Sequence, residues 1–462
     1  MRLFEALLLL TETAALATLA VRPWRATAWP GRLAALAVLA AIAQALVERP
    51  DWRLVPAHGL ALVLALIALR RPRIPSWVGG LATALGLLTL AIAAALPLAF
   101  PVFRMPPPDG PYAIGTSLHH WIDAGRPETF TADPADRRAL MVQVWYPARP
   151  VPGAKRAAYI EDGAALAPLA RLLGLPGFIF GHLASATTNA VPDAPAADGR
   201  ERFPVLVFSH GRAGYRQHST ALVEHLVSHG YVVATIDHPY AAAGVRFPDG
   251  RIVPLDPRMV DRGFVTRRIP DLAGDVSFTL DRLAGLDARG PLAGRLDLAR
   301  AGVMGVSLGG ETTAQACHLD PRARACMIVD VWIPDAVLAE GLRQPTLLLT
   351  RDLATMRAEG WTEADAIETD AEMRGLFNRL SGNGYLVRAP GLYHLDFADT
   401  ALLSPLTGWL GLTGPVDPER ARRITGDFAL AFFDRHLKGA PAPLLDDPGA
   451  RYREVMVERR RR

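Results

Sequence analysis

The 462-residue sequence is poor in the residues that build several classes of protein. It has only two cysteines, Cys317 and Cys326, which are too few for a disulfide scaffold or a four-cysteine zinc site. We interpret them as packed thiols; the alternative is a bridge between them, which only geometry decides. Charged residues make up 21% and hydrophobic residues 50% of the chain, which excludes a disordered protein. The 40 glycines and 38 prolines show no repeat, which excludes a collagen-like chain.

Lysine is almost absent, with Lys155 and Lys438 as its two occurrences, so the net charge of +4 comes from arginine. Nine arginines and four acidic residues lie within residues 1–100, whereas the remainder of the chain is close to neutral. A protein that binds nucleic acid carries its basic residues as a stripe on a folded domain. The sequence therefore predicts no nucleic-acid partner.

Long apolar runs fill the first hundred residues. A helix needs about 20 apolar residues to cross the hydrocarbon core of a bilayer. Two of the runs reach that length, and the two middle ones are shorter and need flanking residues that snorkel. The runs are 3–21, 33–47, 55–69 and 77–98.

Aromatic residues support a membrane location, because Trp29, Trp52 and Trp77 lie at the edges of runs, where an aromatic belt would place them. The first run could instead be a cleaved signal peptide. Glu5 and Glu12 interrupt it, however, and three more runs follow. We therefore expect an all-α transmembrane region of about four helices in residues 1–100.

The arginines also predict an orientation. Loops 22–32 and 70–76 carry three arginines each, against two in loop 48–54. Because cytoplasmic loops carry the excess of basic residues, we place loops 22–32 and 70–76 in the cytoplasm. Both chain termini then lie outside the cytoplasm. We expect an integral protein of the plasma (inner) membrane.

From about residue 105 onward, short β-rich runs alternate with helical stretches. Such alternation favours an α/β fold with a mostly parallel sheet and helices on both faces. We expect this domain to span residues 105–445 and to be followed by a basic, solvated tail, 446–462. The β-rich runs are 140–145, 205–208, 232–236, 301–304, 325–329, 346–350 and 385–388.

A G-x-S-x-G pattern, Gly305-Val306-Ser307-Leu308-Gly309, follows one of these runs and opens a helical stretch. This is the context of a nucleophilic serine on a sharp strand-to-helix turn. The glycines are needed because larger residues would clash beside the serine. A tight glycine turn with an idle serine is the alternative.

A serine nucleophile needs a histidine base and an acid that orients it. Of the twelve histidines, only His394 and His436 follow Ser307 beyond its own helix. His436 lies in an amphipathic terminal helix, so we assign the base to His394, in the loop after the last run. Asp330 and Asp352 each end a run and are both candidates for the acid. The commoner layout of this fold favours Asp352, and either residue could instead cap a helix.

Several motifs resemble the platelet-activating factor acetylhydrolase group of α/β-hydrolases. The resemblance covers most of residues 135–440 and none of 1–100. The motifs are Phe208-Ser209-His210-Gly211, the Gly305–Gly310 turn, Val329-Asp330-Val331-Trp332, His394 with Phe397-Ala398-Asp399, Trp145-Tyr146-Pro147, and Phe432–Leu437.

The resemblance implies that the acid is Asp330, one strand after the serine, in an Asp-x-Trp segment. It also implies an oxyanion hole made by the backbone N–H groups of Leu308 and Arg212, although the family usually has an aliphatic residue at the second position. We expect Trp332 and His210 to line the substrate pocket. The segment Asp237-His238-Pro239-Tyr240 follows a run and is expected to shape the pocket rim.

Together these features predict a membrane-anchored serine hydrolase, outside the cytoplasm, that cleaves carboxylic esters of lipid type or with short acyl chains through an acyl-enzyme. An acyltransferase on the same fold and a non-catalytic membrane sensor are the alternatives. The intact set of Ser307, His394 and Asp330 argues against the sensor. We expect no metal and no organic cofactor, because the adjacent His119 and His120 point to different faces.

Overall fold

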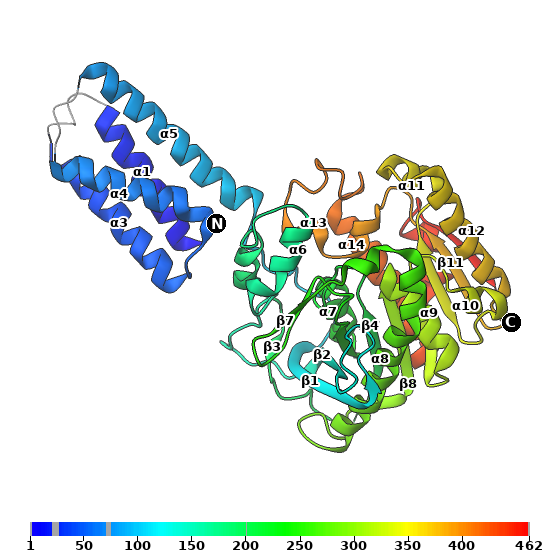
Figure 1. Cartoon of the computed structure of the whole chain (residues 1–462). Coiled ribbons are helices and arrows are strands. Elements are labelled where there is room, and N and C mark those ends of the chain that lie inside the picture. The colour runs from blue at the N-terminus through cyan, green and yellow to red at the C-terminus, as the bar shows by residue number, and fades with distance from the viewer. Residues whose placement is uncertain (1, 21–26, 71–74, 200, 461–462) are drawn as a thin grey trace.

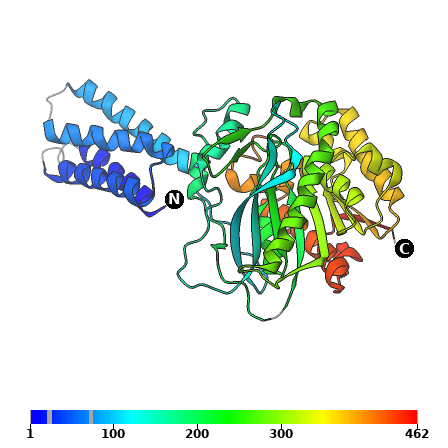
Figure 2. The same cartoon turned by 60° about the horizontal axis from the view of Figure 1, so that its bottom comes forward.

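The computed structural model describes residues 2–20, 27–70, 75–199 and 201–460. An N-terminal helical bundle lies at one end of an α/β domain (Figures 1 and 2). Four segments of the bundle are long and apolar enough to cross a membrane. The two middle segments are longer than the sequence indicated: α3 begins before its apolar run, and η1 with α4 forms a continuous segment, so that each reaches 19 residues. The bundle consists of α1 (Leu3–Ala20), α3 (Trp29–Val47), the 3-10 turn η1 (Trp52–Leu54), α4 (Val55–Arg70) and α5 (Ser76–Ala99).

Apolar side chains cover the outside of this bundle. Only 17–39% of the apolar window in each segment is buried, so most leucines point outward. A soluble helical bundle would present polar residues there. Of the arginines that predicted the orientation, Arg22, Arg25, Arg71 and Arg73 lie outside the described residues.

The bundle contacts the α/β domain through an aromatic cluster. The Trp52 ring lies 5.4 Å from Phe100 and 5.7 Å from Phe178, and Phe100 lies 6.0 Å from His182. The Ser404 hydroxyl also donates a hydrogen bond of 2.6 Å to the carbonyl of Ala99, at the end of α5. We call this contact region the junction.

The α/β domain is built on one ten-stranded sheet with the order β12-β11-β10-β9-β8-β4-β5-β2-β1-β3. The six strands from β11 to β5 run parallel; β2 pairs antiparallel with β5, β1 with β2 and β12 with β11, whereas β3 pairs parallel with β1. The strands are β1 (Ala113–Pro127), β2 (Arg137–Ala148), β3 (Val191–Pro192), β4 (Phe203–Ser209), β5 (Val232–Asp237), β8 (Leu296–Val306), β9 (Ala323–Val329), β10 (Thr346–Thr350), β11 (Gly384–Arg388) and β12 (Met456–Arg460); β6 (Gly244–Arg246) and β7 (Ile252–Pro254) form a separate hairpin.

Helices cover both faces of the sheet, as the alternation of the sequence predicted. In β4, Val205 and Val207 pack with α8, α9 and α12 on one face, whereas Leu206 and Phe208 pack with α7 and α14 on the other. The α-helices are α6 (Ala167–Leu172), α7 (Thr220–Ser228), α8 (Arg262–Ala288), α9 (Leu308–Leu319), α10 (Asp335–Glu340), α11 (Leu353–Glu359), α12 (Glu363–Arg379), α13 (Thr400–Leu403) and α14 (Pro418–Phe433). Short 3-10 or π turns are η2 (Gly163–Leu166), η3 (Gly181–Ser185), η4 (Pro257–Val260), η5 (His394–Phe397), η6 (Asp434–Lys438), η7 (Pro443–Leu445) and η8 (Pro448–Ala450).

Two local expectations differ from the structure. Cys317 and Cys326 form a disulfide rather than a pair of packed thiols, because α9 and β9 follow one another directly and bring the two Cα atoms within 6.5 Å. The segment expected as a solvated tail contributes β12, the edge strand next to β11. Val457 packs there against the core, and Glu458 pairs with Arg388 of β11.

Candidate active site

The carboxyl ends of the parallel strands share one edge of the sheet, which is where ligands bind in α/β folds. Ser307 lies there, between β8 and α9, with a φ of 57° that non-glycine residues rarely adopt. A Cβ on Gly305 would lie 2.2 Å from the carbonyl oxygen of Gly309, and one on Gly309 would lie 2.0 Å from that of Ser209. Only glycine fits at both positions, so the strained turn depends on them.

His394 and Asp330 meet at this edge. Asp330 directly follows β9, and His394 begins η5 in the loop after β11. The Nδ1 of His394 lies 2.6 Å from Oδ2 of Asp330. Since a carboxylate accepts, Nδ1 carries the proton and Nε2 keeps its lone pair. The Asp330 side chain is fully buried, whereas that of His394 is 21% exposed.

Asp330 is held by the strand next to it. The Thr350 hydroxyl donates to Oδ1 at 2.7 Å, and the Arg351 guanidinium lies 3.3 Å from Oδ2. Burial alone would raise the pKa of the Asp330 carboxyl, but Arg351 and the hydrogen bonds from His394 and Thr350 hold it below its ordinary value. The carboxylate therefore stays ionised beside the imidazole.

The sequence analysis missed the supporting residues Arg351, Glu359 and Trp361. Arg351 is fully buried, forms an ion pair with Glu359 and lies 4.5 Å from the Trp361 ring. Glu359 in turn accepts the backbone N–H of His394 at 3.2 Å. The position of Arg351 directly after a β-rich run is a usable signal, because a charged residue at the carboxyl end of a strand lies at the edge where ligands bind.

The second candidate acid, Asp352, has a different role in the structure. Asp352 caps α11, and its Oδ1 accepts the backbone N–H of Thr355 at 2.9 Å. This is the helix-capping role that the sequence left open.

The expected oxyanion groups lie next to Ser307. Leu308 is the first residue of α9, whose opening N–H groups have no partner within the helix. A Cβ on Gly211 would lie 3.2 Å from the Ser307 Cβ, so the loop before Arg212 packs directly on the serine. Within the described chain, the Arg212 N–H has no hydrogen-bond acceptor. The Arg212 guanidinium donates to the Met259 carbonyl at 3.2 Å.

The two expected pocket residues have different environments. Trp332 is half-buried, with the Arg262 guanidinium 4.7 Å from its ring and Trp361 at 6.5 Å. His210 is 1% exposed, and both of its ring nitrogens bond to backbone groups, Gly211 O and His238 N. His210 thus supports the loop from inside, and this geometry does not fit the pocket role that we expected for it.

Neither the Ser307 hydroxyl nor Nε2 of His394 has a hydrogen bond to any described group. Both atoms are therefore available to a substrate and to each other. Glu311, one helical turn after the serine, is a further titratable group that the sequence analysis missed. Packing around it raises the pKa of its carboxyl to about 8, against the opposing charges of Arg262 and Arg212. In the described chain, the side chains grouped closely enough to hold a metal ion are Asp109, His225 and His229, which are not part of this site.

A parallel sheet covered on both faces, with a serine on a strained strand-to-helix turn, defines an α/β-hydrolase. The model of the platelet-activating factor acetylhydrolase, isoform II, family matches residues 99–247 and 285–440, and the chain belongs to that family. This confirms the resemblance seen in the motifs.

Individual relatives agree with this assignment. A platelet-activating factor acetylhydrolase from Canis lupus familiaris is 26% identical over 307 residues, 58% of this chain and 66% of the relative. A bis(hydroxyethyl) terephthalate hydrolase from Streptomyces coelicolor is 32% identical over 186 residues, 35% of this chain and 58% of the relative. The match thus spans less than two thirds of each of these relatives.

The structure of a ferulic acid esterase from Streptomyces cinnamoneus superposes with a TM-score of 0.64 and 31% identity. It covers 77% of this chain and 99% of the esterase chain, which confirms the predicted fold class. Together the comparisons support a carboxylic ester hydrolase.

Proposed function

We propose that the chain is a carboxylic ester hydrolase that acts through an acyl-enzyme on Ser307. The observation that carries the proposal is the pairing of a buried, ionised Asp330 with His394 at the sheet edge that presents Ser307. A fixed Nδ1–H leaves Nε2 free to accept a proton from a serine hydroxyl. The names of the relatives support ester cleavage as the reaction.

In this mechanism Ser307 Oγ forms a bond to the ester carbonyl carbon while its proton moves to Nε2 of His394. The N–H groups of Leu308 and Arg212 bind the resulting oxyanion, each contributing about 2.7–4 kcal/mol. The intermediate collapses as the C–O bond to the alcohol breaks, and His394 returns the proton to that alcohol. Water then attacks the acyl carbon as its proton moves to His394, the bond from that carbon to Ser307 Oγ breaks, and His394 returns the proton to Ser307 as the acid leaves. Asp330 stabilises the imidazolium throughout.

We further propose that the N-terminal helices, residues 1–100, anchor a catalytic domain, 105–445, in the plasma (inner) membrane with that domain outside the cytoplasm. The apolar outer faces of the four helices support the anchor. The Cys317–Cys326 disulfide supports the orientation, because disulfides persist in oxidising compartments.

The substrate that we propose is an ester of a lipid or of a short acyl chain. The contact between bundle and domain supports a lipid ester, since it fixes the catalytic domain beside a membrane. A panel of p-nitrophenyl esters of increasing chain length, assayed on the full chain in detergent micelles, would give the acyl preference.

Labelling with a fluorophosphonate probe tests the nucleophile. Wild-type protein should be labelled on Ser307, and Ser307→Ala should lose both the label and the esterase activity. Ser117→Ala, which removes a serine of β1 that bonds only to His119, is the matched control and should keep both. Esterase activity that survives in Ser307→Ala would overturn the mechanism.

Protease added to intact cells tests the orientation. The catalytic domain should be cleaved without lysis, while tags placed in loops 22–32 and 70–76 should stay protected. Protection of the domain until lysis would place it in the cytoplasm and overturn the proposed orientation.

A further inference from the structure

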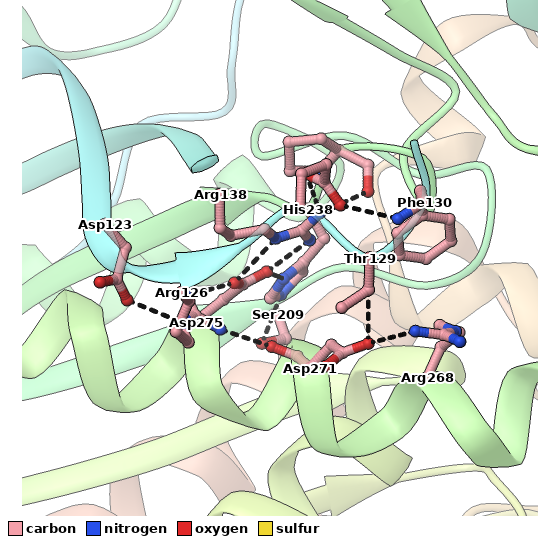
Figure 3. A network of polar contacts seen from close by, with 12 residues as sticks. Asp123, Arg126, Thr129, Phe130, Arg138, Ser209, His238, Arg268, Asp271 and Asp275 are labelled. Carbon is pink, nitrogen blue, oxygen red and sulfur yellow. Dashed lines mark hydrogen bonds and ion pairs between the residues drawn. The ribbon is translucent and has the colours of Figure 1, made fainter. Parts of the chain in front are cut away.

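A serine, a histidine and an aspartate other than Ser307, His394 and Asp330 meet inside the domain (Figure 3). Nε2 of His238 lies 3.0 Å from Oγ of Ser209, and its Nδ1 lies 2.8 Å from Oδ2 of Asp275. Because the Asp275 carboxylate accepts a hydrogen bond from Nδ1–H, Nε2 carries a lone pair and accepts a hydrogen bond from the Ser209 hydroxyl. All three residues are at most 1% exposed, so no substrate reaches Ser209. We call these three residues the buried relay.

The buried relay joins three elements. Ser209 ends β4, the strand beside β8, and His238 follows the end of β5. Asp275 projects from α8, which covers this face of the sheet (Figure 3). The relay therefore ties two neighbouring strand ends to the helix above them.

Two arginines hold the Asp275 carboxylate in place. Arg138 donates to its two oxygens at 3.0 and 2.7 Å, and Arg126 donates to Oδ1 at 2.8 Å. Arg138 is also held by Glu128 at 3.0 Å. Burial would raise the pKa of the Asp275 carboxyl, but Arg138, His238 and their hydrogen bonds hold it far below its ordinary value. A permanent carboxylate thus orients His238.

His238 holds the loop from two sides. Its imidazole binds the Ser209 hydroxyl, and its backbone N–H donates to Nε2 of His210 at 3.2 Å. The Nδ1–H of His210 donates in turn to the carbonyl of Gly211 at 2.7 Å. Ser209, His210 and Gly211 are therefore all tied, directly or through one ring, to His238.

This loop is in close contact with the nucleophile turn, with no room for an added side chain between them. A Cβ on Gly309 would lie 2.0 Å from Ser209 O, and one on Gly211 would lie 3.2 Å from the Ser307 Cβ. The next residue is Arg212, whose N–H is the proposed second oxyanion donor. Any displacement of Ser209 would therefore be transmitted to that donor.

We propose that Ser209, His238 and Asp275 are positioning residues that fix the loop 209–212 so that the Arg212 N–H points at the developing oxyanion. The inference rests on the proposed function, because it assigns a task within that reaction. Preorganised donors act where charge develops, so their loss slows the chemical step more than it weakens substrate binding.

Ser209→Ala tests this proposal in the full chain in detergent micelles, with p-nitrophenyl acetate as substrate. Removal of a whole oxyanion donor costs about 10²–10³-fold in kcat. A displaced donor should cost less, so we expect kcat to fall about 10- to 100-fold while KM changes less than twofold. The inhibition constant of phenylboronic acid, which forms a tetrahedral adduct with the serine, should rise by the same factor as kcat falls. Ser209→Thr, which restores a hydroxyl, should recover part of the loss.

Thr235→Val is the matched control. Thr235 is a fully buried hydroxyl of β5 that bonds to Trp145 Nε1 at 3.2 Å and to Gln143 O at 3.3 Å, outside the relay. Its loss should lower the melting temperature without lowering kcat. An equal fall of kcat in Thr235→Val would mean that Ser209 has only a general structural role, which overturns the proposal.

Arg126→Gln covers the case in which Ser209→Ala does not fold. It removes one of the two arginines on Asp275 at a side chain that is 28% exposed, and Arg138 remains in place. We expect a fall of a few fold in kcat at constant KM. Unchanged kcat in a folded Ser209→Ala, or in Arg126→Gln where Ser209→Ala does not fold, overturns the relay. By contrast, activity in Ser307→Ala overturns the proposed function itself, so the two failures are distinguishable.

Discussion

The domain contains two aspartate–histidine pairs, one at the sheet edge that presents Ser307 and one bonded to Ser209, that share one contact and differ in almost everything else. In both, an aspartate Oδ2 meets a histidine Nδ1, at 2.6 Å in Asp330–His394 and at 2.8 Å in Asp275–His238. Ser307, however, sits half-buried on a turn with positive φ, whereas Ser209 ends a regular strand and is fully buried. The aspartate–histidine contact alone therefore does not identify a catalytic site; exposure and backbone geometry separate the two sets.

The first way to break this comparison is to neutralise the proposed catalytic acid. Asp330→Asn should leave a folded protein whose kcat falls on the order of 10⁴-fold, because His394 loses its orienting partner. Asp352→Asn is the matched control: it weakens a helix cap, costs about 1 kcal/mol and should leave turnover nearly intact. Steady-state kinetics with thermal melting of both variants measures this. The reverse pattern would move the acid to Asp352.

Neutralising the acid of the buried relay should cost more stability than neutralising Asp330. Asp275→Asn leaves Arg126 and Arg138 facing a neutral group, and removing one partner from a buried ion pair costs about 3–5 kcal/mol. Asp330→Asn is milder, because Arg351 keeps Glu359. Unfolding by denaturant should show the larger loss for Asp275→Asn. Equal stability of the two variants would contradict the distinction between a catalytic and a supporting set.

The disulfide tests the role of helix α9. This helix follows Ser307 directly and packs through Gly309 against Ser209 of the buried relay. Cys317→Ser with Cys326→Ser opens a loop of about ten residues and should cost about 2–3 kcal/mol by the loop-entropy estimate. Because the bridge lies at the far end of α9, kcat should be unchanged in the folded variant. Denaturant midpoints with and without reductant measure the first effect. A fall in kcat would show that the bridge also positions Ser307.

A third buried aspartate sharpens the comparison through pH. Asp399 accepts the N–H groups of Thr220 and Ala221 and the Tyr159 hydroxyl, and no arginine among the described residues forms an ion pair with it. Burial raises the pKa of its carboxyl to about 8, whereas arginines hold the pKa of Asp275 and Asp330 low. The folded state then binds the proton more tightly than the unfolded state, so this contribution to stability is present below pH 4 and is lost as pH rises to about 8.

The slope from one such group is at most about 1.4 kcal/mol per pH unit, and Asp399→Asn should remove it. Melting temperatures of the two proteins between pH 4 and 8 measure the difference. Parallel curves would mean that Asp399 is ionised in the folded protein. Asp275 and Asp330 have the opposite sign, and their contributions are lost only as pH falls through the acid range.

The sequence carried much of the fold and part of the site. Apolar length predicted the four helices, and the β-rich runs predicted seven strands of the sheet. The serine turn was visible because its constraints are local: Gly305 and Gly309 exclude every other residue. Strands β1 and β12 were not predicted, because exposed and half-buried residues interrupt the buried ones of β1 and make up all of β12, so neither strand forms a continuous apolar run.

Long-range contacts were not predictable. Ser209, His238 and Asp275 are separated by 29 and 37 residues, and each by itself is an ordinary polar residue. His238 was expected at a pocket rim and is instead 1% exposed. The choice of Asp330 over Asp352 came from the family resemblance, since both residues end a strand. That choice remains a prediction, supported by the hydrogen bond to His394.

If the helices anchor the chain as proposed, the junction between bundle and domain also determines how the domain meets its substrate. Directly after α5 the chain is held by hydrogen bonds to the α/β domain. Met105 N donates to Thr187 O at 2.8 Å, and the Ser404 hydroxyl donates to the carbonyl of Ala99 at the end of α5. A domain on a long, flexible linker samples a large volume and meets molecules at many distances from the membrane and in many orientations. In the proposed arrangement this domain has almost no linker, so its position relative to the membrane is fixed and ester groups have to diffuse to it.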